Sequence, residues 1–213
     1  PARVGFSVDL GIVRVAREVR DVCAAAAARF KDLGAAVDDA CPDFSDAREI
    51  FQILRAFKFA ADRTKLLKEH RDKLKPEVIW NIEKGLALTG EDIARAEAQR
   101  GALFHRMNEF LHYYDALLCP ATIVPPFPVE ERYVKSCNGV QFETYVDWLL
   151  IVAVATLCAC PAMSIPCGFT KSQLPVGLQI ITANRSEAKL LAVAKHLEDV
   201  LDMGAITPID PKP

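Results

Sequence analysis

The first forty residues place the strongest constraint on how this chain can fold. Residues 3–8 (RVGFSV) alternate and are rich in β-branched and aromatic side chains, which is typical of a strand. From about Val13 to Leu33 the apolar residues recur at helical spacing, and Gly34 follows at the position where a helix commonly ends. Residues 35–40 then form a second short strand-like run. A strand, a helix and a second strand in this order normally place the two strands side by side and parallel.

The rest of the chain alternates predicted helices with a few short strands. Helices are expected over 43–75, from Pro76 onwards, from a capping box at 89–92 to about Tyr114, over 141–155, and from Ser186 as N-cap to about Leu201. Strands are expected over 115–119, 162–165 and 176–181, and the segment 120–139, which contains four prolines, forms a long irregular loop. The pattern predicts a mixed α/β domain in which helices outnumber strands.

Charge and hydropathy exclude several classes of partner. The 213 residues carry a formal net charge of −2, which gives no general reason to bind nucleic acid or an anionic membrane. The mostly apolar stretch from Leu149 to Phe169 is interrupted by Pro161 and Pro166. We therefore expect a buried helix that runs into a buried strand, with no membrane span and no nucleic-acid partner.

The cysteines and histidines predict neither disulfides nor a metal site. The seven cysteines include no Cys-x-x-Cys pair, and the four histidines are scattered. Cys158 and Cys160 alternate along an apolar run, which favours buried thiols in a reducing, cytoplasmic compartment. The aspartates between Asp38 and Asp46 lie around a strand end, where turn and capping roles are expected.

The residues alone predict no catalytic site. The chain has no Gly-x-Ser-x-Gly motif, no glycine-rich phosphate loop and no His-Glu-x-x-His motif. None of its six serines is accompanied by a histidine or lysine at a spacing that indicates activation. On this ground the chain by itself is not expected to catalyse a reaction.

The last third of the chain contains its most specific motif. Residues 160–170 (CPAMSIPCGFT) and 174–181 (LPVGLQII) closely resemble the C-terminal signature of the amidase signature family, a Pro-Ala-x-Ser-x-Pro-x-Gly block followed by Gly-Leu-Pro-Val-Gly-Leu-Gln. The helix that opens at Ser186, the segment 114–122 (YDALLCPAT) and the strand 3–7 (RVGFS) resemble further segments of that family. The resemblance covers nearly the whole chain.

This resemblance implies a fold and an activity. The fold is α/β, with a mixed, twisted sheet flanked by helices, and residues 1–213 are its C-terminal part within a single amidase domain. The activity is hydrolysis of carboxylic amides, without a cofactor, by a serine nucleophile, a second serine in a cis peptide and a lysine base. The resemblance places all three in the half that precedes Arg3, so no catalytic residue is assigned within this chain.

The resemblance also implies the partners. They are the N-terminal part of the same protein, which carries the lysine and the serines, and a small-molecule amide. An alternative is a non-catalytic binding or scaffold subunit derived from the amidase fold. The identity of the amide and the presence of a homodimer stay open at this point.

Two segments are candidate walls of the substrate pocket. One follows the proline-rich loop and has aromatic residues with polar tips at helical spacing, and the other ends a buried strand, where α/β sheets commonly open onto ligands. The candidate substrate-binding residues are Tyr145, Trp148 and Thr156 from the first segment, and Pro120, Ala121 and Thr122 from the second.

Two departures from the family pattern concern the substrate. The family often has Asn where this chain has Thr156, and the Asp that helps bind glutamine in its tRNA-linked members falls near Leu149, which is apolar. The resemblance therefore favours an apolar aryl or acyl amide.

Overall fold

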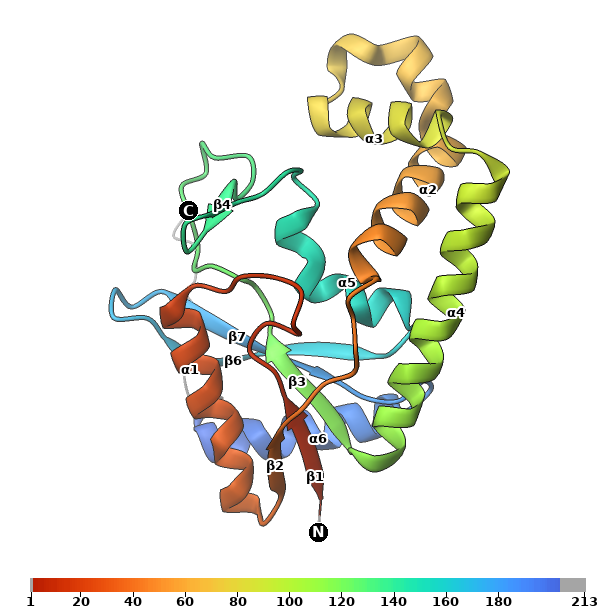
Figure 1. The fold of residues 1–213 in the computed structure, drawn as a ribbon. Helices are drawn as coiled ribbons and strands as arrows, with labels where there is room; N and C mark the ends of the chain where they lie inside the picture. Colours follow the sequence, from red (N-terminus) through yellow and green to blue (C-terminus); the bar gives the residue numbers. More distant parts are fainter. Residues whose placement is uncertain (1, 204–213) are drawn as a thin grey trace.

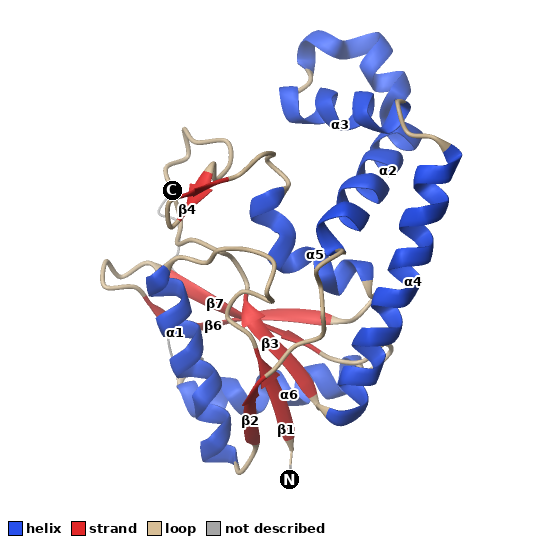
Figure 2. Ribbon diagram, in the orientation of Figure 1, coloured by secondary structure: helices blue, strands red, loops and turns tan. Residues whose placement is uncertain are grey.

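The chain folds into a sheet layer from which a pair of helices extends (Figures 1 and 2). The structure is a computed structural model that describes residues 2–203. Its strands are β1 (Arg3–Phe6), β2 (Ala36–Asp39), β3 (Ala116–Pro120), β4 (Ser136–Cys137), β5 (Val140–Gln141), β6 (Ala162–Phe169) and β7 (Pro175–Ile181). Its α-helices are α1 (Arg17–Ala28), α2 (Ala47–His70), α3 (Pro76–Leu86), α4 (Gly90–Tyr113), α5 (Leu150–Leu157) and α6 (Glu187–Leu201). Short 3-10 helices are η1 (Arg29–Leu33), η2 (Arg71–Lys73) and η3 (Asp147–Leu149).

The main sheet combines parallel and antiparallel strands. Within residues 2–203 it has five strands in the order β2-β1-β3-β7-β6. β1 is parallel to both β2 and β3, and β7 lies antiparallel between β3 and β6. The predicted strand–helix–strand unit at the start of the chain is therefore confirmed. Gly34 has φ 76°, in the left-handed region that glycine adopts easily, and this lets the chain turn from η1 into β2.

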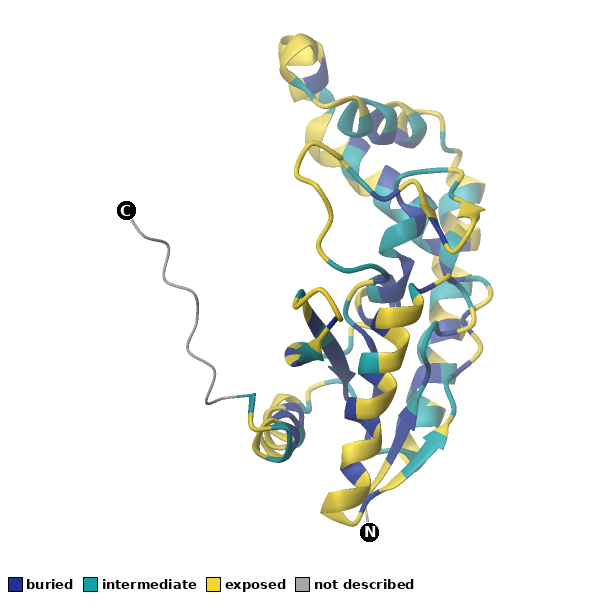
Figure 3. Cartoon of the chain, turned by 90° about the vertical axis from the view of Figure 1, so that its left-hand side faces the viewer, coloured by how far each residue is buried: buried dark blue, intermediate teal, exposed yellow. Residues whose placement is uncertain are grey.

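β3 and β7 form the centre of the core. All five residues of β3 are buried, which explains why this run is continuously apolar instead of alternating. β7 adds Leu178, Ile180 and Ile181, which are fully buried. Helices α1 and α6 pack against β6 and β7, and Figure 3 shows buried residues both on strands and on the helices around them. The predicted fold class, a mixed α/β sheet flanked by helices, is confirmed.

Helices α2 and α3, with η2 between them, form what we call the helical arm (residues 47–86). The arm leads away from the sheet, and α4 runs beside α2 back toward it (Figure 1). Helix α3 begins at Pro76 and α4 begins with the capping box, both as predicted. In the capping box, Thr89 Oγ1 accepts from the Asp92 amide at 3.2 Å, and Asp92 Oδ2 accepts from the Thr89 amide at 3.0 Å.

The helix predicted over 141–155 is wrong in its first half. The α-helix begins at Leu150, and the residues before it form β5, a turn and η3. Asp147 Oδ2 accepts from the Thr144 amide at 2.8 Å, and Thr144 Oγ1 accepts from the Val146 amide at 3.3 Å. Such side chain–backbone hydrogen bonds compete with helical ones, and here they hold a turn. Tyr145 therefore lies outside the helix to which the apolar spacing assigned it.

Two smaller predictions are also corrected. The first helix begins at Arg17, after a turn over residues 9–13, and not at about Val13. Ser186 stands at the N-cap position of α6, but its side chain does not cap the helix. The Ser186 hydroxyl donates to the carbonyl of Ala183 instead, which closes the turn that leads into the helix.

The apolar stretch from Leu149 to Phe169 forms a buried helix followed by a strand, as predicted. The prediction that this strand is buried is wrong: β6 lies at the edge of the sheet, and only Ile165 and Cys167 of its residues are buried. None of the helices between residues 2 and 203 is both long enough and apolar enough to cross a membrane. The seven cysteines are free, and five of them are buried. In the same range, no three His, Cys, Asp or Glu side chains are grouped so that they could hold a metal ion.

Candidate functional site

A pocket opens where the carboxyl ends of β3 and β6 meet the start of β7, and we call it the strand-end pocket. Its position follows from the sheet register, which pairs Pro120 of β3 with Leu178 and Pro166 of β6 with Gly177. The pocket measures about 630 Å³. It is lined by Ala121, Thr122, Val124, Pro125, Pro126, Phe127, Trp148, Ser164, Pro166, Pro175, Val176 and Gly177.

The strand-end pocket is apolar and built from small residues. None of its lining residues in the described chain is charged. Gly177 keeps the floor open, because a Cβ at that position would lie 2.7 Å from Ser164 Oγ and 3.3 Å from Ala121 Cβ. The amide of Ala121 donates to the Gly177 carbonyl at 2.9 Å, which joins the end of β3 to β7. The pocket is therefore suited to a neutral, mainly apolar group.

A second pocket shares one wall with the first, and we call it the aromatic pocket. The shared residue is Trp148, whose ring packs edge-on against Phe127 with centroids 5.9 Å apart. The indole Nε1 of Trp148 is buried and has no hydrogen-bond partner among the described residues. The aromatic pocket measures about 420 Å³ and is lined by Arg55, Phe59, Lys75, Glu77, Val78, Val129, Glu131, Arg132, Tyr133, Tyr145, Trp148 and Leu149.

Tyr145 connects the helical arm to this pocket. Its hydroxyl oxygen accepts from Arg55 Nε at 3.2 Å and also from the side-chain amide of Asn81, which is buried on α3. Its ring packs edge-on against Trp80 and Tyr133, with centroids 5.9 and 6.0 Å apart. These contacts fix the ring and hydroxyl of Tyr145 between both arm helices.

An ion pair between a buried carboxylate and a partly exposed arginine holds the turn that carries Tyr145. Asp147 is 5% exposed, and its Oδ1 accepts from Arg48 Nε of α2 at 2.8 Å. Burial raises the pKa of Asp147, but hydrogen bonds from Arg48 and from the Thr144 amide outweigh burial, so the pKa lies below its ordinary value. Nearby, burial and the Arg48 charge lower the pKa of Lys84, whose ammonium donates to Gln52 Oε1 at 2.8 Å.

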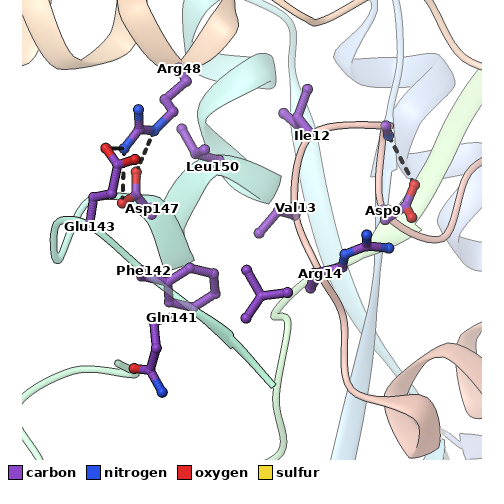
Figure 4. A pocket seen from close by; sticks show the side chains of 12 residues that line it. Asp9, Ile12, Val13, Arg14, Arg48, Gln141, Phe142, Glu143, Asp147 and Leu150 are labelled. Atoms are coloured by element: carbon purple, nitrogen blue, oxygen red, sulfur yellow. Dashed lines mark hydrogen bonds and ion pairs between the residues drawn. The ribbon is translucent and has the colours of Figure 1, made fainter. Parts of the chain in front are cut away.

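A third pocket lies between the β1–α1 loop and the segment that follows β5 (Figure 4). It measures about 420 Å³ and presents Arg14 and Asp9 opposite the Arg48 group. Arg48 is already paired there, with Asp147 and with Glu143 Oε2 at 2.7 Å. This pocket therefore contains a satisfied charge cluster and no serine or cysteine in its lining.

Two thiols of the described chain, those of Cys119 and Cys160, are not activated as nucleophiles. Burial raises the pKa of the Cys119 thiol to about 12 and that of the Cys160 thiol to about 11, so both stay protonated at neutral pH. Ser164 lies in the strand-end pocket, but between residues 2 and 203 no serine hydroxyl is hydrogen-bonded to a lysine or a histidine. Cys23 and Cys167, whose sulfurs are 4.0 Å apart, are both buried between α1 and β6.

The structure brings four of the six candidate substrate-binding residues together. Ala121, Thr122 and Trp148 line the strand-end pocket, and Tyr145 lines the aromatic pocket on the other side of Trp148. The other two, Pro120 and Thr156, line neither pocket: Pro120 is buried within β3, and Thr156 is exposed on α5. Their role in binding substrate stays a prediction.

Sequence reasoning missed two residues, Arg55 and Gly177. Arg55 lies in a predicted helix with many charges, so nothing local distinguishes it from solvent-exposed arginines. Gly177 belongs to the motif at 174–181, but the motif does not show that this glycine lies against Ser164 and Ala121 in the strand-end pocket. Both omissions concern contacts between segments that are distant in the sequence.

Comparison with known proteins gives a consistent result. A sequence profile of the family described as Amidase matches residues 1–191. The acylamidase of Rhodococcus erythropolis is 32% identical over 211 residues, which are 98% of this chain and 44% of the relative. The chain therefore spans less than half the length of that relative.

Solved structures agree with this comparison. A crystal structure of an amidase has a TM-score of 0.81 at 27% identity and matches 93% of this chain and 46% of its own. A bacterial aryl acylamidase belonging to the amidase signature enzymes has a TM-score of 0.80 at 20% identity, covering 98% of this chain and 46% of its own, and shows the same fold.

Proposed function

Because the chain belongs to the amidase family, we propose that it forms the C-terminal part of an enzyme that hydrolyses a carboxylic amide. Water is added across the C–N bond, and the products are a carboxylic acid and an amine or ammonia. The serine nucleophile, the second serine and the lysine base come from polypeptide that precedes Arg3, as the resemblance implies. The observation that carries the proposal is the family match over residues 1–191 in a chain that aligns with 44% of an acylamidase.

In this proposal the chain supplies the sheet, the core and the walls of the substrate pocket. The strand-end pocket holds the reacting amide in a setting without charged groups, where water is excluded and the attack geometry is restricted. Several of its lining side chains, including Thr122, Ser164 and Pro166, are exposed. They form a surface of small residues on which the catalytic part of the protein can pack.

The proposal is tested with the complete polypeptide encoded by the gene. We expect it to release aniline from acetanilide or ammonia from benzamide. Gly177→Ala places a methyl group in the strand-end pocket against a serine hydroxyl that can rotate away, so the fold is kept while substrate is displaced. The expected loss in kcat/KM is roughly 10- to 100-fold.

A matched glycine on α4 provides the control. Gly101 has nothing within 4 Å of an added Cβ, so Gly101→Ala is expected to leave kcat/KM unchanged. If the complete polypeptide cleaves neither aryl nor aliphatic amides, the proposal is wrong, and the alternative of a non-catalytic binding or scaffold subunit is favoured. An equal response to both substitutions would contradict the placement of the amide in the strand-end pocket.

A further inference from the structure

Arg55 is a cation without an acidic partner. Its Nε donates to the Tyr145 hydroxyl, and no Asp or Glu oxygen of the described chain lies within 4.0 Å of its guanidinium. Of the other charged residues that line this pocket, Arg132 contacts Glu77 at 2.9 Å, while Lys75 and Glu131 form no ion pair among the described residues. The two terminal nitrogens of Arg55 therefore have unused donors at the wall of the aromatic pocket.

Aromatic rings hold the Arg55 guanidinium in place. Its central carbon lies 4.8 Å from the ring centroid of Phe59, 5.7 Å from that of Phe51 and 5.8 Å from that of Tyr145. Guanidinium stacks favourably on aromatic faces and keeps its planar donors free at the edge. The side chain is thus ordered before any ligand arrives, which reduces the entropy lost on binding.

The charge around this group favours a monoanion. Three cations (Arg55, Lys75 and Arg132) and two carboxylates (Glu77 and Glu131) line the pocket, so the formal balance is +1. A carboxylate matches both this balance and the fork of two parallel N–H donors. A phosphate dianion would leave one negative charge beside two carboxylates.

We propose that Arg55 binds a carboxylate group of the substrate, so that the amide hydrolysed carries a second, anionic group on an aromatic or other flat body. This inference rests on the proposed function. Trp148 lines both pockets, so a substrate whose amide lies in the strand-end pocket extends past the indole to Arg55. Phe59, Tyr133 and Tyr145 line the pocket beyond Trp148 and provide aromatic faces for the body of the substrate.

The test uses substrate pairs that differ in charge but not in shape. A nitro group is a planar, neutral isostere of a carboxylate, so the pairs are 4-acetamidobenzoate with 4-nitroacetanilide, and 4-carbamoylbenzoate with 4-nitrobenzamide. The first pair has the substituent on the amine side of the amide, and the second has it on the acyl side. We expect the complete enzyme to have a lower KM for the carboxylate member of at least one pair.

Arg55→Gln removes the charge. In that pair it should raise KM for the carboxylate by roughly 10- to 100-fold, as expected for a lost hydrogen bond to a charged group, and change KM for the nitro compound less than about twofold. Arg55→Lys keeps the charge but lacks the two parallel N–H donors. Its KM for the carboxylate should lie between those of the parent enzyme and Arg55→Gln. Thermal unfolding of each variant shows whether the Tyr145 contact is needed for folding.

Arg63→Gln is the matched control. Arg63 is also on α2, and its guanidinium also lies over Phe59, at 4.1 Å from the centroid, but it is exposed and does not line the pocket. Arg63→Gln should leave KM unchanged for both the carboxylate and the nitro compound. The same loss in Arg63→Gln as in Arg55→Gln would overturn the inference.

Direct binding separates this inference from the proposed function. Calorimetric titration with 4-acetamidobenzoate should show binding that Arg55→Gln weakens, whether or not the amide is cleaved. Binding without turnover of any amide would support the carboxylate site and contradict the hydrolase. Amide turnover with no preference for the carboxylate, or an equal change for both members of a pair in Arg55→Gln, would support the hydrolase and overturn the carboxylate site.

Discussion

The sheet layer and the helical arm bury their residues in different ways. The contiguous apolar core runs through the strands and the helices packed on them, and it includes only the first turn of α2. Beyond that turn, the arm buries a few large aliphatic side chains outside this core, such as Ile82, beside small residues such as Ala56 and Gly85 and the amide side chain of Asn81. The sheet layer is thus stabilised by one contiguous apolar core, and the arm by a few separate aliphatic side chains, close helix approach and polar contacts.

The two pockets differ in the same way. The strand-end pocket, at the sheet, has no charged lining in the described chain, while the aromatic pocket, against the arm, contains Arg55 and other charged groups. In the two proposals made above, the sheet holds the neutral amide and the arm recognises what is attached to it. The following predictions test this comparison, beginning with the largest expected effect.

Leu178→Ala should cost about 3 kcal/mol of unfolding free energy, because it leaves a cavity in a fully buried position of a central strand. Urea denaturation followed by circular dichroism measures the change. Leu191→Ala, at a position 56% exposed on α6, is the control and should change stability by less than about 0.5 kcal/mol. A cost below about 1 kcal/mol at Leu178 would contradict a core centred on β7.

Gly85→Ala should lower the unfolding free energy by about 2 kcal/mol, because the added Cβ would lie 2.0 Å from the Ala56 carbonyl oxygen and force the arm helices apart. Gly101→Ala is the same change in an exposed part of α4, where it should be neutral or stabilise by up to about 1 kcal/mol. Hydrogen exchange should show the loss of protection confined to α2 and α3. Loss of protection throughout the sheet would show that the arm and the sheet unfold as one unit.

Asp147→Asn should cost about 1–2 kcal/mol at neutral pH, since the carboxylate is buried while its partner Arg48 is 41% exposed and partly screened. The pKa of Asp147 in the folded state lies below its ordinary value of about 3.9. The stability that the carboxylate contributes is therefore complete above a pH of about 3.9, and it is lost as the pH falls through the lowered pKa of the folded state. The stability difference between the parent and the variant should therefore shrink in acid.

Urea titrations from pH 7 to pH 2 measure this difference. Asp62→Asn, which removes a carboxylate from an exposed pair with Lys58, is the control and should change little at any pH. A stability difference that stays constant down to pH 2 would exclude a role for the Asp147 charge.

Thr89→Ala should cost about 1 kcal/mol, because it removes the cap at the start of α4, beside the arm. Thr89→Ser keeps the hydroxyl and should retain most of the stability. Thermal unfolding of the three proteins measures both effects. Equal losses in Ala and Ser would assign the contribution of Thr89 to its methyl group and not to capping.

Predictions from the sequence succeed where a pattern depends on near neighbours. The first strand–helix–strand unit, Pro76 at the start of α3 and the Thr89–Asp92 capping box each depend on residues within one element or its connection. The predicted helix start at residue 141 is wrong because Thr144 and Asp147 hold a turn, and Arg48, 99 positions before Asp147, completes it. Apolar spacing contains no information about that partner.

The same distinction between local patterns and distant contacts applies to the residues of the candidate site. Ala121 and Thr122 are predicted from a strand end and Trp148 from its place after the proline-rich loop, and the three line one pocket. Arg55 could not be distinguished from other arginines of its helix, because its partner Tyr145 lies 90 positions further along the chain.

The sequence by itself determined the class of fold and the family, because apolar periodicity, turn residues and the Pro-Ala-Met-Ser-Ile-Pro block are properties of short segments. Only the tertiary structure decided which segments lie next to each other. It placed an apolar pocket at the sheet beside an aromatic one at the arm, with Trp148 between them. The physical reason is that packing joins residues by distance in space, and a charge such as that of Arg55 acquires a function only from the groups that surround it.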